Sequence, residues 1–232
     1  MSILNKKVLF LGNSYVYVND LPNVLSNLAK SGGYELITDH ITRGGAKLQE
    51  FLFNGDELNS ALNNKLKENQ WDYVVLQEQS QVPAIPHKCQ NEMYPSIRLL
   101  NDRIKSCNAK TILFMTWGRK FGDADNGFEN FETMQQALKE GYAKIGNEIS
   151  SLIAPVGLAW LKAKLKKVDI ELWDEDCSHP SSMGTYLTAC VFYSLLYKQS
   201  PVGLSYTAGL SKDVARTLQE SAFETIQESW GE

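Results

Sequence analysis

The chain has 232 residues, of which 43% are hydrophobic and 22% charged, a composition typical of a folded protein rather than a disordered or fibrous one. A formal net charge of -4 gives no general attraction for phosphate backbones or anionic lipids, so we expect neither a nucleic-acid partner nor a membrane partner. The apolar run VLFLG near the N-terminus is too short for a secretion signal, and no segment approaches the roughly 18 apolar residues of a membrane span. We therefore expect a cytoplasmic protein with one domain over residues 1–232, and the oligomeric state is left open.

Apolar segments rich in β-branched and aromatic residues alternate with segments of helical period, the pattern of parallel strands joined by crossover helices. This alternation predicts an α/β fold with a doubly wound parallel sheet. The expected strands cover residues 7–11, 35–42, 72–77, 111–116 and 151–155. The expected helices cover residues 21–30, 56–68, 94–106, 131–149, 157–166, 182–197 and 212–229, each with apolar residues at spacings of three and four.

Four loops are candidate binding segments, because open parallel sheets bind ligands beyond the carboxyl ends of their strands. They cover residues 12–20, 43–49, 78–87 and 117–130. A late helix is also expected to begin just after His179, since Pro180 suits a first helical turn and serines follow it.

Ser14 directly follows the first predicted strand and precedes a helix. At such a turn a serine hydroxyl is exposed and backbone N–H groups converge on one point, which suits a nucleophile and the stabilisation of negative charge. Serine is also a common helix cap, and position alone favours that structural role. As a nucleophile, Ser14 needs a base within hydrogen-bonding distance and an acceptor that orients the base.

Only three histidines are available as that base. His40 lies inside a predicted strand, and His87 lies in a proline-bracketed loop without an acidic neighbour. His179 follows Asp176 by three residues near the start of the expected late helix, a spacing that lets the carboxylate orient the imidazole. A DxxH match also arises by chance, so this one gains its weight from the presence of Ser14.

The acidic residues beside this motif have a simpler explanation. Asp174 and Glu175 suit a solvated acidic cap at the first turn of a helix. A metal site of Asp174, Asp176 and His179 is conceivable, but neither an HExxH motif nor a histidine pair supports it. The four cysteines also lack metal-ligand spacing, so we expect no metal and four free thiols, with Cys177 inside the motif.

Candidate oxyanion donors follow the second and third predicted strands. Gly44 and Gly45 lie where an exposed backbone N–H would donate to an oxyanion, although a tight turn with positive φ explains them equally well. The segment QEQS, residues 77–80, offers side-chain amides for the same role, while a polar surface loop is the simpler interpretation of each residue. Neither GxGxxG nor GxSxG occurs, which argues against a dinucleotide site and an ordinary α/β-hydrolase elbow.

These residues together resemble the SGNH (GDSL-type) hydrolase family. The first family block, usually GDS, corresponds to Gly12-Asn13-Ser14, and the DxxH block corresponds to residues 176–179. Gly45 lies where the family has its oxyanion glycine, and WDYVVLQEQS, residues 71–80, occupies the strand and loop that normally carry its asparagine. The blocks occur in the family's order over nearly the whole chain, closest to an uncharacterised bacterial subgroup.

The resemblance implies a flavodoxin-like three-layer α/β/α sandwich with about five parallel strands, and cofactor-independent hydrolysis of acyl esters. It assigns Ser14 as the nucleophile, His179 as the base and Asp176 as the residue that orients the histidine. Asn13 stands in place of the usual aspartate of the first block, a change that removes none of these three residues.

The family's GxND motif is missing after the third strand, and its asparagine position falls on Ser80. We expect the Gln79 side chain to replace that donor and the Ser14 and Gly45 N–H groups to complete the oxyanion hole, with Ser80 as the fallback.

The expected substrate is a small-molecule or carbohydrate ester with a short acyl group, acetyl above all, because no loop carries the apolar stretch that would line an acyl-chain tunnel. The candidate substrate contacts are Asn13, Tyr15, Gly44, Ser80 and Trp117. Tyr15 and Trp117 suit stacking on a sugar ring and suit a buried or rim position equally well. A lipid-like esterase or thioesterase, and a non-catalytic binding protein on the same fold, are the alternatives.

Overall fold

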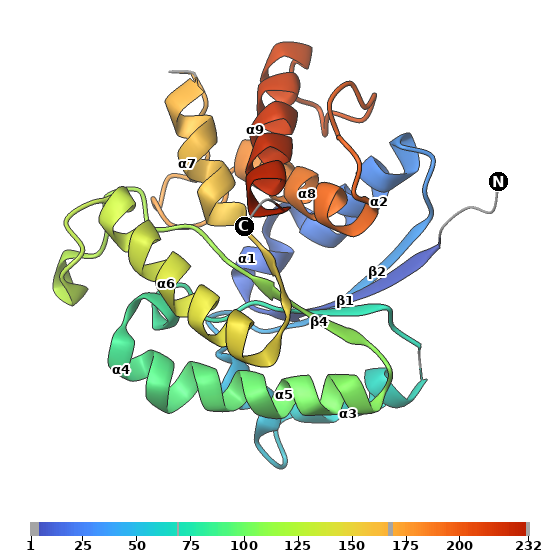
Figure 1. Cartoon of the computed structure of the whole chain (residues 1–232), viewed down its shortest axis with the longest axis vertical. Helices are drawn as coiled ribbons and strands as arrows, with labels where there is room; N and C mark the ends of the chain where they lie inside the picture. Colours follow the sequence, from blue (N-terminus) through green and yellow to red (C-terminus); the bar gives the residue numbers. More distant parts are fainter. Residues whose placement is uncertain (1–4, 69, 167–168, 231–232) are drawn as a thin grey trace.

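Five parallel strands form one sheet at the centre of the computed structural model, which describes residues 5–68, 70–166 and 169–230 (Figure 1). The order across the sheet is β2-β1-β3-β4-β5, the order of flavodoxin-like doubly wound folds. The strands are β1 (Lys6–Gly12), β2 (Leu36–Thr42), β3 (Tyr73–Leu76), β4 (Lys110–Phe114) and β5 (Leu152–Ala154). Each predicted strand is present with slightly different ends, and the predicted fold class is confirmed.

Helices fill the connections between strands and the C-terminal part of the chain. The predicted helices are all present, as α2 (Leu21–Ser31), α3 (Glu57–Glu68), α5 (Tyr94–Ser106), α6 (Phe131–Ile149), α7 (Val156–Lys166), α8 (Ser182–Tyr197) and α9 (Lys212–Trp230). Among the helices described, none is long and apolar enough to cross a lipid bilayer. The N-terminal stretch considered as a secretion signal includes residues 1–4, which lie outside the described residues.

Short helical turns occur in or next to the predicted loops. They are α1 (Ser14–Tyr17), α4 (Pro86–Lys88), 3-10 turns at Val18–Asp20, Leu48–Leu52, Val82–Ala84 and Ala124–Asn126, and a π turn at Cys89–Met93. Helix α8 begins at Ser182, as predicted for residues 182–197, but Pro180 precedes the helix and does not lie in its first turn. The Ser181 side chain accepts the N–H groups of Met183 and Gly184, which places the N-cap one residue beyond the proline.

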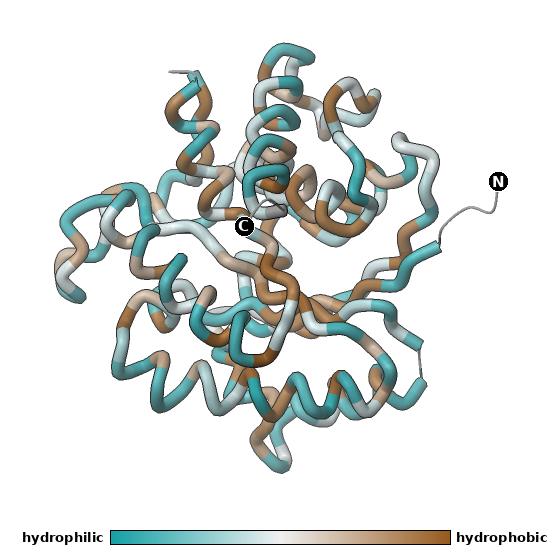
Figure 2. The backbone as a smooth tube through the Cα atoms, in the orientation of Figure 1, coloured by the Kyte–Doolittle hydropathy of each residue, from teal (hydrophilic) through white to brown (hydrophobic). Residues whose placement is uncertain are grey.

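Each face of the sheet is covered by its own hydrophobic core. Alternate residues of β1 point to opposite faces, with Val8 and Phe10 in one core and Leu9 and Leu11 in the other. Helices α2, α7, α8 and α9 build the first core, while α3, α5 and part of α6 build the second (Figure 1). Figure 2 shows hydrophobic residues along the strands and hydrophilic residues toward the outside. The burial of both faces explains the nearly continuous apolar runs of the strands.

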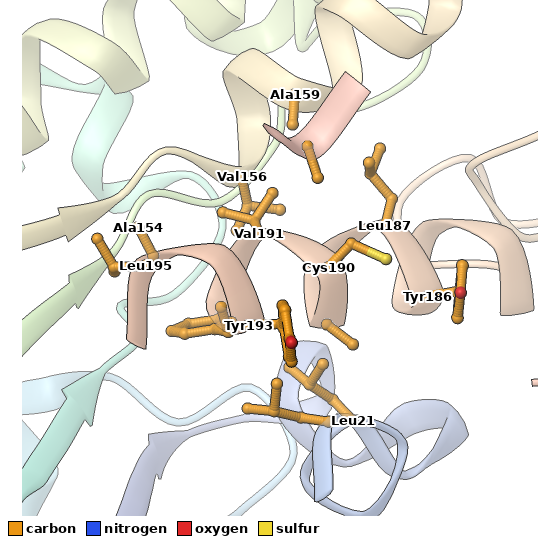
Figure 3. Packing of buried hydrophobic residues seen from close by; sticks show 14 of the residues in the cluster. Leu21, Ala154, Val156, Ala159, Tyr186, Leu187, Cys190, Val191, Tyr193 and Leu195 are labelled. Carbon is orange, nitrogen blue, oxygen red and sulfur yellow. The ribbon is translucent and has the colours of Figure 1, made fainter. Parts of the chain in front are cut away.

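Helix α8 lies inside the first core and positions the loop that precedes it. From Gly184 to Tyr197 every residue of α8 is buried, and Figure 3 shows its side chains between Leu21 of α2 and Ala159 of α7. A helix that is hydrophobic on all sides is stable only when its neighbours surround it. The N-terminus of α8 is therefore fixed relative to the sheet, as is the loop that carries His179.

The strand order places a topological switch point at the carboxyl end of β1. Strand β1 pairs with β2 on one side and with β3 on the other, so the connections to the two sides run in opposite directions across the sheet. Doubly wound folds bind ligands at such a switch point. Residues 12–20 and 78–87 begin at this position.

Candidate active site

The turn that carries Ser14 is built at the end of β1. A Cβ atom added to Gly12 would lie 2.3 Å from Gln77 Oε1, so the close approach of these residues requires glycine. The approach lets Gln77 Oε1 accept the Asn13 N–H at 2.8 Å. Asn13 Oδ1 accepts the Tyr15 N–H at 3.1 Å as the N-cap of α1. Ser14 therefore begins the helix, and its hydroxyl is not needed for capping.

Two expectations about this turn are corrected. The helix-cap explanation of Ser14 is wrong, because Asn13 performs that role. Asn13 is also unsuited to contact substrate, since it is 3% exposed and its Nδ2 donates to the Ala46 carbonyl at 3.0 Å. Asn13 instead ties the loop after β1 to the loop after β2.

Backbone hydrogen bonds fix the loop that carries His179. The Asp174 N–H donates to the His179 carbonyl at 2.8 Å, and the Ser181 N–H donates to the Leu172 carbonyl at 2.9 Å. Cys177 closes the turn between them with a φ of 60°, in the left-handed region. The imidazole is therefore carried by a closed turn that leads directly into α8.

The three side chains predicted to be catalytic form one hydrogen-bonded chain. His179 Nε2 lies 2.8 Å from Ser14 Oγ, although 165 positions separate the two residues in the sequence. On the other side of the ring, His179 Nδ1 hydrogen-bonds Asp176 Oδ2. When Nδ1 donates to the carboxylate, Nε2 is left as an acceptor for the serine proton. The structure thus brings together the arrangement that a serine nucleophile requires, and the catalytic role of these residues remains a prediction.

Asp176 is held as a carboxylate in the open part of this chain. Its Oδ1 accepts the N–H groups of Ser178 at 3.0 Å and His179 at 2.9 Å. Partial burial raises the pKa of Asp176, but hydrogen bonds from the His179 ring and from these two N–H groups outweigh burial and lower the pKa below its usual value. The side chains of His179 and Asp176 are 34% and 49% exposed, so the site is open to solvent.

Tyr15 and Trp117 lie behind the histidine rather than in an open subsite. Tyr15 is 4% exposed, stacks on Trp117 at a centroid distance of 4.7 Å and meets the His179 ring edge-on at 5.5 Å. Trp117 is 1% exposed and also stacks on Trp160 at 4.1 Å. The predicted stacking of Tyr15 and Trp117 on a sugar ring is therefore wrong, because both rings are buried against other aromatic rings.

Ser178 connects these aromatic residues to the histidine loop. The Tyr15 hydroxyl lies 2.7 Å from Ser178 Oγ, and Trp117 Nε1 donates to the Ser178 carbonyl at 3.0 Å. Burial raises the pKa of Tyr15, an effect that hydrogen bonds to Ser178 and Ser80 partly offset. Sequence reasoning missed Ser178, because its partners lie far away along the chain.

The two backbone N–H groups predicted to bind an oxyanion are available. The Ser14 N–H is at the start of α1, and Gly45 lies in an exposed turn with a φ of 69°. Within the described part of the chain, neither N–H has an acceptor. Gly44 is exposed beside them, and a Cβ there would lie 3.4 Å from the Tyr17 hydroxyl. The positive φ agrees with the turn interpretation of Gly45, which is compatible with a donor role.

The Gln79 side chain is oriented by its oxygen and has a weakly bound amide nitrogen. Gln79 Oε1 accepts the N–H groups of Gln81 at 2.9 Å and Val82 at 3.3 Å. Gln79 Nε2 has only long contacts, 3.4 Å to Ser80 Oγ and 3.3 Å to Gln81 Oε1. Ser80 is buried and hydrogen-bonds Tyr15, which makes Gln79 the more accessible of the two candidate donors.

Gln77 and Glu78 are buried, so the surface-loop interpretation is wrong for both. Gln77 supports the Asn13 N–H, as described above. Glu78 Oε1 accepts the N–H groups of Leu48 at 3.1 Å and Gln79 at 2.7 Å, and so joins the loops that follow β2 and β3. Burial raises the pKa of Glu78 to about 7 despite these hydrogen bonds. The only sequence signal for burial was that both residues directly continue an apolar strand.

The other polar residues considered in the sequence lie apart from this chain of contacts. His40 is exposed on β2, with Nδ1 3.0 Å from Thr42 Oγ1, and His87 is exposed on α4. Asp174 and Glu175 are exposed. Among the described residues, no three His, Cys, Asp or Glu side chains are grouped to hold a metal ion.

A family model described as a domain of unknown function, DUF4886, matches residues 53–223. The chain belongs to the DUF4886 family. Within this family match lie the loop after β3 and the turn with Asp176 and His179, whereas Ser14 and Gly45 precede it. No curated protein sequence matches the chain.

Several solved structures are similar to this DUF4886 chain. A DUF4886 family protein from Bacteroides uniformis has a TM-score of 0.81 at 19% identity, over 97% of this chain and 96% of that one. A protein described as a proposed SGNH hydrolase from Slackia heliotrinireducens has a TM-score of 0.70 at 27% identity, over 83% of this chain and 99% of that one. A mutant of an acetyl-xylooligosaccharide esterase from Geobacillus Stearmophilus has a TM-score of 0.56 at 17% identity, over 81% and 92%. The DUF4886 chain thus has the fold of SGNH hydrolases and esterases, and the resemblance stated from the sequence is confirmed.

Proposed function

We propose that this protein is a serine ester hydrolase that removes small acyl groups, acetyl above all, with Ser14, His179 and Asp176 as its catalytic triad. The observation that carries the proposal is the continuous hydrogen-bonded chain from Ser14 Oγ through the imidazole to the Asp176 carboxylate. A structural serine needs no such base. The SGNH hydrolase fold supports the same reaction class.

The reaction begins when Ser14 Oγ attacks the ester carbonyl and its proton passes to His179 Nε2. Asp176 stabilises the resulting imidazolium through Nδ1–H. The tetrahedral intermediate collapses as His179 protonates the leaving alcohol, which leaves an acyl group on Ser14. Water then attacks this acyl-enzyme, giving its proton to His179, and the acid is released with the Ser14 hydroxyl restored.

The oxyanion of each tetrahedral intermediate is proposed to accept hydrogen bonds from the Ser14 N–H, the Gly45 N–H and Gln79 Nε2. The first two have no acceptor among the described residues, and the third has only long contacts. Donors that are fixed in place before the reaction stabilise developing charge without reorganisation.

A short acyl group and a large alcohol part fit the site best. The aromatic residues nearest the histidine are packed against one another, so they leave no apolar wall for an acyl chain. The exposure of His179 and Asp176 allows the alcohol part to extend into solvent. The name of the acetyl-xylooligosaccharide esterase of the same fold is consistent with an acetylated carbohydrate, although at 17% identity it supports the fold alone.

The test compares 4-nitrophenyl acetate with 4-nitrophenyl octanoate, using the wild type, Ser14→Ala and Ser60→Ala. Ser60 is an exposed serine of α3 and serves as the matched control. The proposal predicts acetate hydrolysis that Ser14→Ala lowers about a thousandfold or more and Ser60→Ala leaves unchanged. A preference for octanoate would indicate a lipid-like esterase or thioesterase. Wild-type protein no faster than Ser14→Ala would indicate a non-catalytic binding protein.

A further inference from the structure

Arg119 lies in the loop after β4, between two residues that contact the histidine loop. Trp117 Nε1 donates to the Ser178 carbonyl at 3.0 Å, and the Lys120 N–H donates to the Cys177 carbonyl at 2.9 Å. The Arg119 N–H donates to Met134 Sδ at 3.3 Å, which fixes the backbone at this point. The loop with Arg119 is therefore attached to the turn that carries the proposed base.

Among the described residues, the guanidinium of Arg119 has no hydrogen-bonding partner, whereas the side chain of every other arginine has one. The other arginine side chains donate to acceptors, Arg43 to Glu50 and Asp56, Arg98 to Glu148, Arg103 to Asn59 and Arg216 to Glu220. Among the described residues, none accepts a hydrogen bond from the Arg119 side chain, and its Nε is buried without a partner. A partly buried cation without a counter-charge is unfavourable, which suggests that an anion completes the site.

The charge of Arg119 has an electrostatic effect near the proposed active site. It acts on the buried Tyr15 hydroxyl, whose pKa it lowers against the larger effect of burial. Tyr15 in turn hydrogen-bonds Ser178 and packs edge-on against His179. Together with the contacts that Trp117 and Lys120 make to the histidine loop, this effect places Arg119 on the side of the molecule that carries the proposed base.

Three acidic residues near this loop have other partners. Asp176 hydrogen-bonds His179, and Glu171 pairs with Lys120 at 2.5 Å. Asp123 accepts from Gln81 Nε2 at 2.6 Å and from an asparagine of its own loop. With these carboxylates nearby and Arg119 as a single cation without a partner among the described residues of the loop, the site suits a singly charged anion better than a phosphate dianion.

We propose that Arg119 forms an anion subsite beside Ser14 and binds a carboxylate on the alcohol part of the substrate, which makes the substrate class the acyl esters of acidic molecules, such as acetylated acidic sugars. The proposal rests on the esterase function proposed above. The planar guanidinium fits a carboxylate through two parallel hydrogen bonds, a geometry that discriminates between a charged substrate and its neutral analogue.

The test uses 3- and 4-acetoxybenzoate with the corresponding acetoxybenzamides, which differ in charge and little in shape. Released acetate is measured for the wild type, Arg119→Gln, Arg119→Lys and Lys120→Gln. We expect the wild type to prefer at least one carboxylate ester, and Arg119→Gln to lower that preference about tenfold or more, through KM. Arg119→Lys restores part of the preference, and Lys120→Gln, which removes the neighbouring paired cation, leaves it unchanged. An equal loss on charged and neutral esters, or no loss, overturns the proposal.

A binding measurement keeps this test separate from the esterase proposal. The products 3- and 4-hydroxybenzoate and their amides are titrated into wild-type protein and Arg119→Gln by NMR or calorimetry. Tighter binding of a carboxylate than of its amide, lost in Arg119→Gln, supports the anion subsite even if neither ester is hydrolysed. Equal binding of the acid and the amide by the wild type contradicts it, whatever the hydrolytic activity.

Discussion

The two sides of the candidate site differ in how their hydrogen-bonding groups are used. On one side, Ser14 Oγ, the His179 ring and the Asp176 carboxylate are bonded to one another. On the other side, the N–H groups of Ser14 and Gly45 and the Arg119 guanidinium have no acceptor among the described residues. Groups that move a proton must be aligned before the reaction, whereas groups that receive negative charge from a substrate must be free for it.

The two sides also differ in how they are attached to the rest of the fold. The bonded side is carried by a closed turn that enters the buried helix α8, and Tyr15 and Trp117 support it from behind. Apart from the Ser14 N–H, the unbonded side consists of the loops after β2, β3 and β4, which Glu78 and Asp123 connect through hydrogen bonds. Changes to the two sides should therefore have different consequences for rate, selectivity and stability.

The largest effect is expected on the bonded side, from Asp176→Asn. The amide keeps the shape of the side chain but favours the wrong tautomer of His179, so hydrolysis of 4-nitrophenyl acetate should fall about ten-thousandfold. Glu175→Gln, a change in the exposed neighbouring acid, is the control and should retain wild-type activity. Activity of Asp176→Asn within tenfold of the wild type would remove Asp176 from the proposed triad.

A smaller effect is expected on the unbonded side, from Gln79→Glu. Glutamate keeps the oxygen that accepts the N–H groups of Gln81 and Val82 but has no N–H to donate to an oxyanion. The rate constant kcat should fall about a hundredfold to a thousandfold, the usual effect of losing one such donor, with little change in thermal stability. Gln136→Glu, at an exposed position of α6, is the control. Unchanged kcat would show that the oxyanion is bound without Gln79.

The smallest effect is expected in the pH dependence of the free energy of unfolding, tested with Glu78→Gln. Glu78 connects the loops that follow β2 and β3. Burial raises the pKa of Glu78 from 4.5 to about 7, so the folded protein favours the protonated acid more than the unfolded chain does. The stabilisation is fully present below pH 4.5 and is lost as the pH rises to about 7, a change of about 3 kcal/mol in the free energy of unfolding.

Glu78→Gln keeps an acceptor for the Leu48 and Gln79 N–H groups and cannot ionise. Denaturant unfolding at a series of pH values should therefore show a decline between pH 4.5 and 7 in the wild type relative to Glu78→Gln, and a constant difference above that range. Parallel pH profiles for the two proteins would show that Glu78 does not titrate in this range.

Much of the fold followed from local sequence signals. Continuous apolar runs marked the strands because both faces of the sheet are covered, and the long helices carried their periodicity in their own sequences. The short turns α1 and α4 were missed, because three or four residues contain too little periodicity to be recognised. Pro180 was wrongly expected in the first turn of α8, because the Ser181 side chain caps the helix one residue beyond the proline.

In the candidate site too, local motifs were predictable from the sequence and contacts between distant residues were not. The order of the GNS turn and the DxxH motif was enough to predict the three residues that the structure brings together. The burial of Trp117, the hydrogen bond from Asn13 to the Ala46 carbonyl and the contacts of Ser178 were not predictable, because their partners are distant in the sequence. Arg119 carried no motif, and only the absence of a partner in three dimensions distinguishes it from other arginines.

The most direct test of the central claim is covalent labelling by a fluorophosphonate, followed by mass spectrometry of the digested protein. The account predicts one label, on Ser14, that is absent in Ser14→Ala and strongly slowed in His179→Ala, because an unactivated serine does not react. Folded wild-type protein that takes up no label, or takes it up on another residue, would contradict the assignment of Ser14 as an activated nucleophile.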